Sequence, residues 1–190
     1  MIYDLSYPDV QMARRMAIDI CEGYARGAKE ESRVLAIQGK PRIDNDVQTQ
    51  AAGRMAEIAA CRYLGIDPIF ALNWSSRCDT GADFVLSDTR RVDVKSSLHP
   101  RAQYLIWPVT KKHFMQDMAD VMIFARVLDA SIGRVELVGW TNKDYFLAHH
   151  ETANGLSGMI DGTPFVRAAN LWDMGKLQDG EWDGKQRARY

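Results

Sequence analysis

Residues Gly81–Ser97 read GADFVLSDTRRVDVKSS, two short apolar-rich runs on either side of a polar turn. This pattern predicts a β-hairpin, because β-branched and aromatic residues favour strands and small polar residues favour turns. With the turn centred on Asp88, Asp83 lies opposite Asp93. Side chains alternate along a strand, so Lys95 shares the face of Asp93. The hairpin therefore carries two carboxylates and an amine on one face.

That face is suited to a divalent cation. Carboxylates directly opposite each other in a sheet repel and weaken the pairing. They become favourable when a hard cation such as Mg²⁺ lies between them, because such ions take oxygen ligands and retain several waters. Lys95 would then hold a water or a phosphate oxygen beside the ion. Asp83, Asp93 and Lys95 are therefore the centre of the candidate site.

A third carboxylate is expected from the helix before the hairpin. The pattern of Val47–Leu64 predicts a helix that ends at Gly65. Glu57 lies on a stripe of small or apolar residues, so this face of the helix should pack closely. A carboxylate on such a surface needs a partner, and the neighbouring metal site offers one. An ion pair with Arg54 on the same helix is the alternative.

Outward from this region, helices come first and strands follow. Ser6, Pro8 and Asp9 provide an N-cap, an early proline and an acid three residues after the cap, which predicts a first helical region to about Gln38. Strands are predicted from six runs: PIFAL (68–72), ADFVL (82–86), RVDVKSS (91–97), QYLIWPV (103–109), ADVMIFARVL (119–128) and RVELVGW (134–140). A short helix is expected in TNKDYFLAHHE (141–151) and an edge strand in TPFVRAANLWDM (163–174). This order predicts an α+β fold with a sheet flanked by helices.

The acidic residues and the lysine together resemble the motif of a known superfamily. Glu57 on a helix, Asp83 at the start of a strand and the Asp-Val-Lys motif at 93–95 in the next strand resemble the PD-(D/E)xK nucleases. Their order along the chain is the order in that superfamily. Ala82 stands where the superfamily name has a proline.

The resemblance covers about residues 53–140 and implies both a fold and an activity. It implies a central mixed β-sheet flanked by helices, an α/β/α-like core as in restriction endonucleases. It also implies hydrolysis of phosphodiester bonds with Mg²⁺, for which Mn²⁺ would substitute. By this resemblance Asp83 and Asp93 would be metal ligands and Glu57 an additional ligand, directly or through a water. Lys95 would orient the attacking water.

The composition is ordinary for a globular chain. The 190 residues are 46% hydrophobic and 26% charged, with a formal net charge of −1, and we expect one domain. We divide it into an N-terminal helical region (1–45), a catalytic core (46–142) and C-terminal elements with a polar tail (143–190). The three cysteines form no CxxC pair, which argues against a zinc site or a disulfide framework. Without a secretory-signal pattern or a membrane-length apolar run, a cytoplasmic location is expected.

The local charge around the hairpin is more basic than that of the whole chain. Basic residues outnumber acidic ones between Arg77 and Lys112, which favours a nucleic-acid partner. We expect DNA, with RNA as an open alternative, and contacts to its backbone from Arg77, Ser97, Arg101, Lys111 and Lys112. A solvated charged face is the competing interpretation. Because the chain has one such centre, cutting both strands of a duplex would need a dimer or two sequential events, and we expect a homodimer.

Two other interpretations belong to different classes. The first is a nuclease-like fold without catalysis that binds nucleic acid or a protein partner. All four positions of the motif hold chemically competent residues, which argues against it. The second is an α+β protein in which Asp83, Asp93 and Lys95 form a structural ion-pair cluster. Stabilisation by a divalent metal would separate the metal site from the ion-pair cluster.

Overall fold

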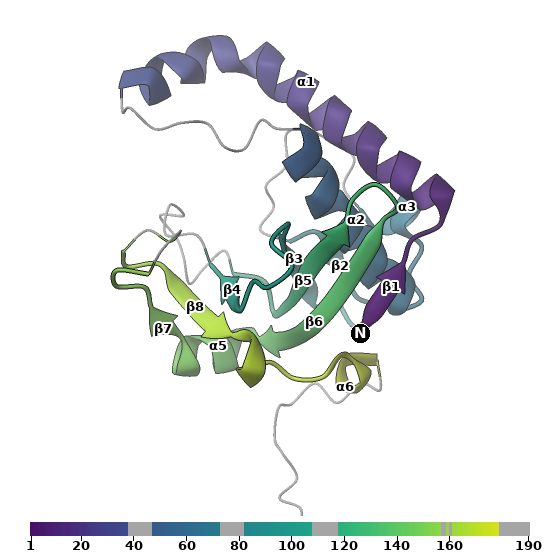
Figure 1. Ribbon diagram of the computed structural model, residues 1–190, viewed down its shortest axis with the longest axis vertical. Helices are drawn as coiled ribbons and strands as arrows, with labels where there is room; N and C mark the ends of the chain where they lie inside the picture. The colour runs from purple at the N-terminus through teal and green to yellow at the C-terminus, as the bar shows by residue number, and fades with distance from the viewer. Residues whose placement is uncertain (38–46, 73–81, 108–117, 157–158, 160, 179–190) are drawn as a thin grey trace, which may run out of the picture.

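The centre of the molecule is a five-stranded mixed sheet (Figure 1). The structure is a computed structural model that describes residues 1–37, 47–72, 82–107, 118–156, 159 and 161–178. The strand order is β1-β6-β5-β3-β2, with β3 and β5 parallel and the other pairs antiparallel. The strands are β1 (Ile2–Asp4), β2 (Phe84–Val85), β3 (Arg91–Ser97), β5 (Val121–Asp129) and β6 (Arg134–Asn142).

A second, three-stranded sheet has the order β4-β8-β7. Its strands are β4 (Tyr104–Ile106), β7 (Glu151–Thr152) and β8 (Pro164–Arg167). The strand expected within 163–174 is present, but it is the middle strand and not an edge. Leu105 of β4 pairs with Val166 on one side of β8, and Glu151 of β7 pairs with Phe165 on the other. Its place depends on partners that are distant in sequence, which a local pattern does not encode.

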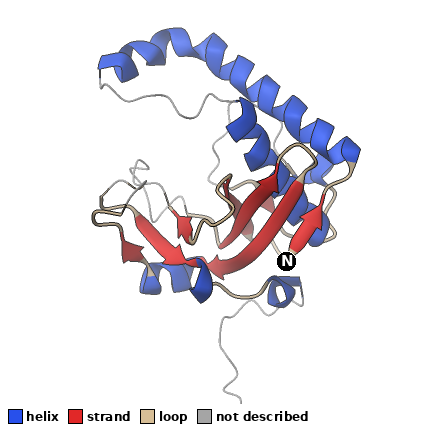
Figure 2. Cartoon of the chain, viewed as in Figure 1, coloured by secondary structure: helices blue, strands red, loops and turns tan. Residues whose placement is uncertain are grey.

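Helices flank the sheets and complete the α+β fold. They are α1 (Tyr7–Ile37), α2 (Val47–Tyr63), α3 (Pro68–Ala71), α5 (Lys143–His149) and α6 (Met174–Gln178), with a 3₁₀ turn at Ala168–Asn170. Figure 2 shows α1 and α2 together on one side of the molecule and α5 beside the smaller sheet. Within the described residues, no helix combines the length and the apolar character needed to cross a membrane.

The central strand β5 is buried on both faces. Ile123 and Ala125 face the larger hydrophobic core, which α1 and α2 line. Met122 and Phe124 alternate with them and face a second core that includes Trp107 and residues of α5 and β8. A strand covered on both faces reads as a nearly continuous apolar run, as the sequence of β5 does. The sheet therefore separates two cores, and β3 lies next to β5 between them.

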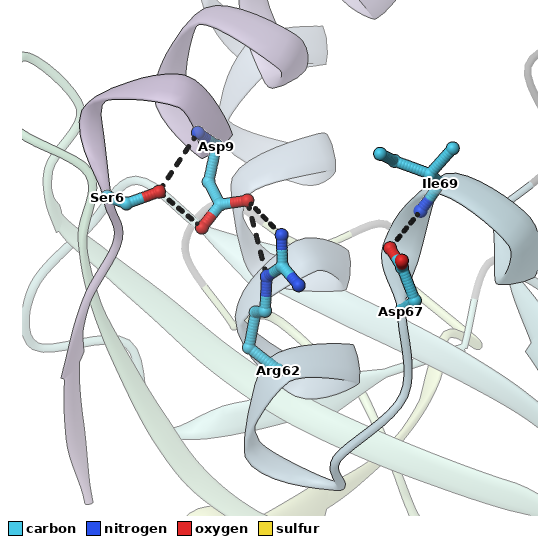
Figure 3. A network of polar contacts seen from close by, with 5 residues as sticks. All are labelled: Ser6, Asp9, Arg62, Asp67 and Ile69. Atoms are coloured by element: carbon cyan, nitrogen blue, oxygen red, sulfur yellow. Dashed lines mark hydrogen bonds and ion pairs between the residues drawn. The ribbon is translucent and has the colours of Figure 1, made fainter.

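A capped helix start fixes α1 to α2 (Figure 3). Ser6 Oγ donates to Asp9 Oδ2 at 2.7 Å and accepts from the Asp9 N–H at 3.3 Å, which confirms the predicted cap. Arg62 of α2 donates from Nη2 to Asp9 Oδ1 at 2.8 Å and from Nε at 3.3 Å. Burial alone would raise the pKa of Asp9, but the Arg62 and Ser6 hydrogen bonds outweigh it and lower that pKa. The two helices are thus joined by an ionised pair.

The end of α2 follows the sequence-based expectation. Gly65 has a positive φ of 72°, a conformation that glycine adopts without strain. The Ile66 N–H donates to the Cys61 carbonyl at 2.8 Å and the Gly65 N–H to the Arg62 carbonyl at 3.2 Å, the hydrogen bonds of a Schellman motif. The helix ends at Tyr63, one residue before the predicted end.

The prediction of a strand in PIFAL (68–72) is wrong. Pro68–Ala71 form the short helix α3, with Asp67 as its N-cap and Pro68 in its first turn. Asp67 Oδ1 accepts a hydrogen bond from the Ile69 N–H at 3.0 Å (Figure 3). The capping signal Asp-Pro, favourable for a helix start, outweighs the β-propensity of Ile69 and Phe70.

Candidate active site

Asp93 and Lys95 lie on β3 and form an ion pair. Asp93 is buried, with 4% of its surface exposed, and Lys95 is half-buried. Lys95 Nζ donates to Asp93 Oδ1 at 2.7 Å and lies 2.6 Å from Asp93 Oδ2. The same nitrogen lies 5.1 Å from the centre of the Trp107 ring, within the range of a cation–π contact. The ammonium group is therefore positioned by a carboxylate and an aromatic face.

The pairing of β2 with β3 brings Asp83 to this strand. Phe84 pairs with Val92, which is the register predicted from the sequence and puts Asp83 opposite Asp93. The Asp83 N–H donates to the Val92 carbonyl at 2.8 Å, and Asp83 Oδ2 accepts from the Val94 N–H at 2.7 Å. The carboxylate thus serves as a hydrogen-bond acceptor for β3 beyond the end of the two-residue strand β2.

Glu57 reaches the site from α2. Its side chain is buried, among the small residues that form the packed face of this helix. Arg54, one turn earlier, donates from Nη1 to Glu57 Oε2 at 2.5 Å. The ion pair considered as an alternative from the sequence is therefore present. It compensates the buried charge of Glu57 within the helix.

The electrostatics show that the carboxyl groups from the three elements interact. Burial raises the pKa of Asp83 well above its usual value, and the charges of Glu57 and Asp93 raise it further. The hydrogen bond from the Val94 N–H and the charge of Lys95 act in the opposite direction and lower this pKa. Burial also raises the pKa of Glu57, against the pull of its arginine partner, and the charge of Asp93 adds to the rise. Carboxyl groups influence one another in this way only when they are near each other in a poorly solvated site. Glu57, Asp83, Asp93 and Lys95 therefore form one cluster.

Cys61, one helical turn after Glu57, lies near the same cluster. Burial raises the pKa of its thiol to about 12, and the charges of Glu57 and Asp83 contribute to the rise. A thiol with this pKa is protonated at neutral pH, so it is neither a nucleophile nor an anionic ligand. The chemistry of the cluster rests on its carboxyl and amine groups.

The cluster has donor atoms that suit a hard cation. Three carboxyl groups face the basic groups of Arg54 and Lys95. Asp93 Oδ2 is buried, and Lys95 Nζ at 2.6 Å is its ion-pair partner. Within those residues, no three His, Cys, Asp or Glu side chains are grouped closely enough to hold a metal ion on their own. Mg²⁺ is commonly held by one or two carboxylates and completed by water and phosphate oxygens, and Asp83 and Asp93 fit that pattern.

An open hollow of about 440 Å³ lies beside the cluster. Asp83 lines it, together with Phe70 of α3, Val85 of β2 and Arg91 of β3. Phe70 is 88% exposed. Sequence reasoning missed this residue as part of a site, because the pattern of PIFAL predicts a strand. The Asp-Pro helix start at 67–68 was the signal that could have placed it on a short helix instead.

The predicted nucleic-acid contacts are divided by the structure. Arg101 is exposed in the loop after β3, and Ser97 Oγ accepts a hydrogen bond from the His99 N–H at 3.1 Å. The hydroxyl of Ser97 therefore stabilises the loop. Arg77, Lys111 and Lys112 lie outside the described residues.

Comparison with known proteins gives no relative for this chain. No protein-family model, no curated protein and no solved structure matches it.

Proposed function

We propose that the protein is a metal-dependent nuclease of the PD-(D/E)xK type that hydrolyses phosphodiester bonds, with DNA as substrate, in the cytoplasm. The observation that carries this proposal is the cluster of Glu57, Asp83, Asp93 and Lys95. These residues come from a helix, the start of a hairpin and the next strand, and burial raises the pKa of Glu57 and of Asp83. Raised pKa values of grouped acids are typical of functional sites.

Asp83 and Asp93 would hold Mg²⁺ or Mn²⁺, and Glu57 would support the ion through a water. A bound ion of this type lowers the pKa of a coordinated water and neutralises charge on the phosphate. The hydrogen bond between Asp83 and the Val94 N–H fixes one carboxylate relative to the strand that carries the other. This arrangement orients both acids without reorganisation when substrate binds.

Lys95 would orient the attacking water and stabilise negative charge that develops on the phosphate. Its ammonium group is already held by Asp93 and lies over the Trp107 ring. The ring covers one side of the amine and reduces its contact with water. A positive charge held in this way interacts more strongly with a phosphate than one on a mobile surface chain.

A structural ion-pair cluster is the second candidate, and one observation favours it. Glu57 and Asp93 each have a basic partner, Arg54 and Lys95, within the described residues. Such pairs would satisfy these two buried carboxylates without a metal. This candidate gives no role to Asp83, which forms no ion pair within the described residues although it lies opposite Asp93. We therefore place the nuclease first.

The experiment compares the wild type with Lys95→Ala and Asp93→Asn on linear, circular, single-stranded and branched DNA and on RNA. Each substrate is incubated with Mg²⁺, Mn²⁺ or EDTA. Lys176→Ala and Asp144→Asn are matched controls, because both residues are exposed and lie outside the cluster. We expect metal-dependent cleavage by the wild type and the controls, and a loss of at least about 100-fold in both site variants.

Other results would separate the candidates. A wild type that binds DNA in Ca²⁺ but cleaves nothing would support the non-catalytic binding module. A wild type that neither binds nor cleaves, and whose melting temperature ignores Mg²⁺ and Mn²⁺, would support the structural cluster. Light scattering of the active protein tests the proposed homodimer, since a monomer that cuts both strands of a duplex would contradict it.

A further inference from the structure

The hollow beside Asp83 exposes an aromatic ring at the edge of the candidate active site. Phe70 is 88% exposed, and Val85 is 54% exposed. Large exposed apolar groups that gather in one place mark sites of interaction. Phe70 and Val85 line the hollow of about 440 Å³ that Asp83 also lines.

Local structure holds Phe70 in this exposed position. Asp67 caps the short helix α3 through the Ile69 N–H (Figure 3), and the Phe70 N–H donates to the Asp67 carbonyl at 3.2 Å. Pro68 and Leu72 are buried at the two ends of this segment. Because the buried residues anchor the backbone, the ring of Phe70 stays on the solvent side. Its exposure is therefore built into the fold.

A fixed cation lines the same hollow. The guanidinium group of Arg91 donates from Nη2 to the Met118 carbonyl at 2.8 Å, and its Nε lies 3.8 Å from Asp120 Oδ2. Arg91 keeps 37% of its side chain exposed. An arginine has five N–H donors, so these contacts leave donors for an anion that enters the hollow. The hollow thus combines an aromatic face, a fixed positive charge and a carboxylate of the candidate metal site.

We propose that this hollow binds one unpaired nucleotide next to the phosphate to be cleaved, with its base stacked on Phe70 and a neighbouring phosphate at Arg91. The proposal rests on the nuclease function proposed above. The volume of the hollow lies within the range of small-ligand sites and is sufficient for a single base. Aromatic rings stack on bases of any sequence, but inside a duplex the faces of a base are covered by its neighbours. The enzyme therefore acts on single-stranded DNA or on the unpaired part of a branched molecule.

The test uses oligonucleotides that carry 2-aminopurine, a base whose fluorescence reports stacking. Binding is measured in Ca²⁺, in place of Mg²⁺, for single-stranded, flapped and fully paired DNA. Phe70→Ala and Phe70→Leu both remove the aromatic ring, but Phe70→Leu keeps a large apolar side chain. Phe70→Tyr keeps the aromatic ring. Ile132→Ala is the matched control, because Ile132 is an apolar residue with 57% exposure in the turn between β5 and β6. Since Phe70 is exposed, all variants should keep the wild-type melting temperature.

We expect Phe70→Ala and Phe70→Leu to weaken single-strand binding by roughly 5- to 150-fold, the range for loss of one stacked base. Phe70→Tyr and Ile132→Ala should bind like the wild type, and binding to fully paired DNA should not change. Wild-type affinity in Phe70→Leu, or tighter binding to the paired duplex than to single strands, would overturn the proposal. In that case the exposed surface is better explained as a contact for a protein.

The two proposals fail in different ways. If Asp93→Asn abolishes cleavage while every Phe70 variant binds and cleaves like the wild type, the nuclease function is supported and the nucleotide site at Phe70 is wrong. If single strands bind through Phe70 but no substrate is cleaved with any added metal ion, the nucleotide-binding site is supported and the nuclease function is wrong. If the wild type neither binds nor cleaves any nucleic acid, both proposals are wrong.

Discussion

Asp83 has two roles that substitution can separate: a charge and a hydrogen-bond acceptor. Asp83→Asn removes the charge but keeps an oxygen that accepts from the Val94 N–H, whereas Asp83→Ala removes both. Because burial and neighbouring acids raise the pKa of Asp83, its ionised form destabilises the folded protein. We therefore expect Asp83→Asn to be at least as stable as the wild type in EDTA at pH 7, and Asp83→Ala to be less stable.

The magnitude follows from the hydrogen bond. Leaving a buried N–H without an acceptor costs about 1–3 kcal/mol. For a chain of 190 residues, 1 kcal/mol corresponds to about 2–4 °C in melting temperature. Asp83→Ala should thus melt about 2–12 °C below Asp83→Asn. Neither variant carries the charge, so the charge does not contribute to this difference.

The dependence on pH has a defined sign. A carboxyl group with a raised folded-state pKa contributes stability below its unfolded value, here 3.8, and this contribution is lost as the pH rises toward the folded-state pKa. In EDTA, the wild type should therefore lose stability relative to Asp83→Asn as the pH rises above about 4. The ratio of folded to unfolded protein in urea, measured across this range for both proteins, gives the comparison directly.

A divalent metal should reverse the order of stability. At a concentration 100 times its dissociation constant, Mg²⁺ would stabilise the wild type by about 2.7 kcal/mol, or about 5–11 °C in melting temperature. Asp83→Asn and Asp93→Asn should show little of this shift, while Asp144→Asn should show all of it. Circular dichroism at constant ionic strength measures each melting temperature. If Mg²⁺ raises the melting temperature of Asp83→Asn as much as that of the wild type, Asp83 is not a ligand. If Asp83→Ala and Asp83→Asn have the same melting temperature in EDTA, the hydrogen bond of Asp83 does not stabilise the protein.

Two further predictions concern the helices. Arg62→Met should destabilise the protein by about 1–3 kcal/mol in urea unfolding, because it leaves the buried carboxylate of Asp9 without its guanidinium partner. Because the pKa of Asp9 is lowered, the ion pair stabilises the protein above pH 3.8 and loses this effect as the pH falls. The free energies of unfolding of Arg62→Met and the wild type should therefore become equal in acid. A difference that stays the same in acid would contradict the ion pair. Cys61 should resist alkylation at pH 8 in the native protein and react in urea, as mass spectrometry can follow, because its thiol is buried with a pKa of about 12. Reaction of native Cys61 as fast as that of the half-buried Cys21 would contradict this burial.

The local features of the fold could be predicted from the sequence. The register of β2 and β3 was correct because a short turn and the alternation of side chains determine it together. The predicted stop of α2 at Gly65 was correct, because this glycine supplies the positive φ that the end of the helix requires. The strand predicted in PIFAL failed because two capping residues outweighed the propensities of the residues that follow. Local signals conflict at that point, and the stronger one acts through specific hydrogen bonds.

The arrangement of the strands could not be predicted in the same way. The sequence pattern identified β8 as a strand, but its central position depends on pairing with β4, far away in the chain. The same limit applies to the site. Alternation along one strand put Asp93 and Lys95 on one face, and the structure adds their ion pair and the Arg54 partner of Glu57. Whether such partners compensate a buried acid is decided by packing between elements, which a one-dimensional pattern does not contain.

The parallel pairing of β3 with β5 has a consequence for how the chain folds. The hairpins β2–β3 and β5–β6 join strands that follow each other directly, so they close short loops and lose little chain entropy. Parallel neighbours instead require a crossover, here the connection from Leu98 to Asp120, which contributes β4 to the second sheet. Non-local contacts of this kind form only after the entropy of a longer loop is lost. Asp93 and Lys95 lie on β3 itself, so the cluster gains its buried surroundings only when the crossover has closed and both sheets are in place.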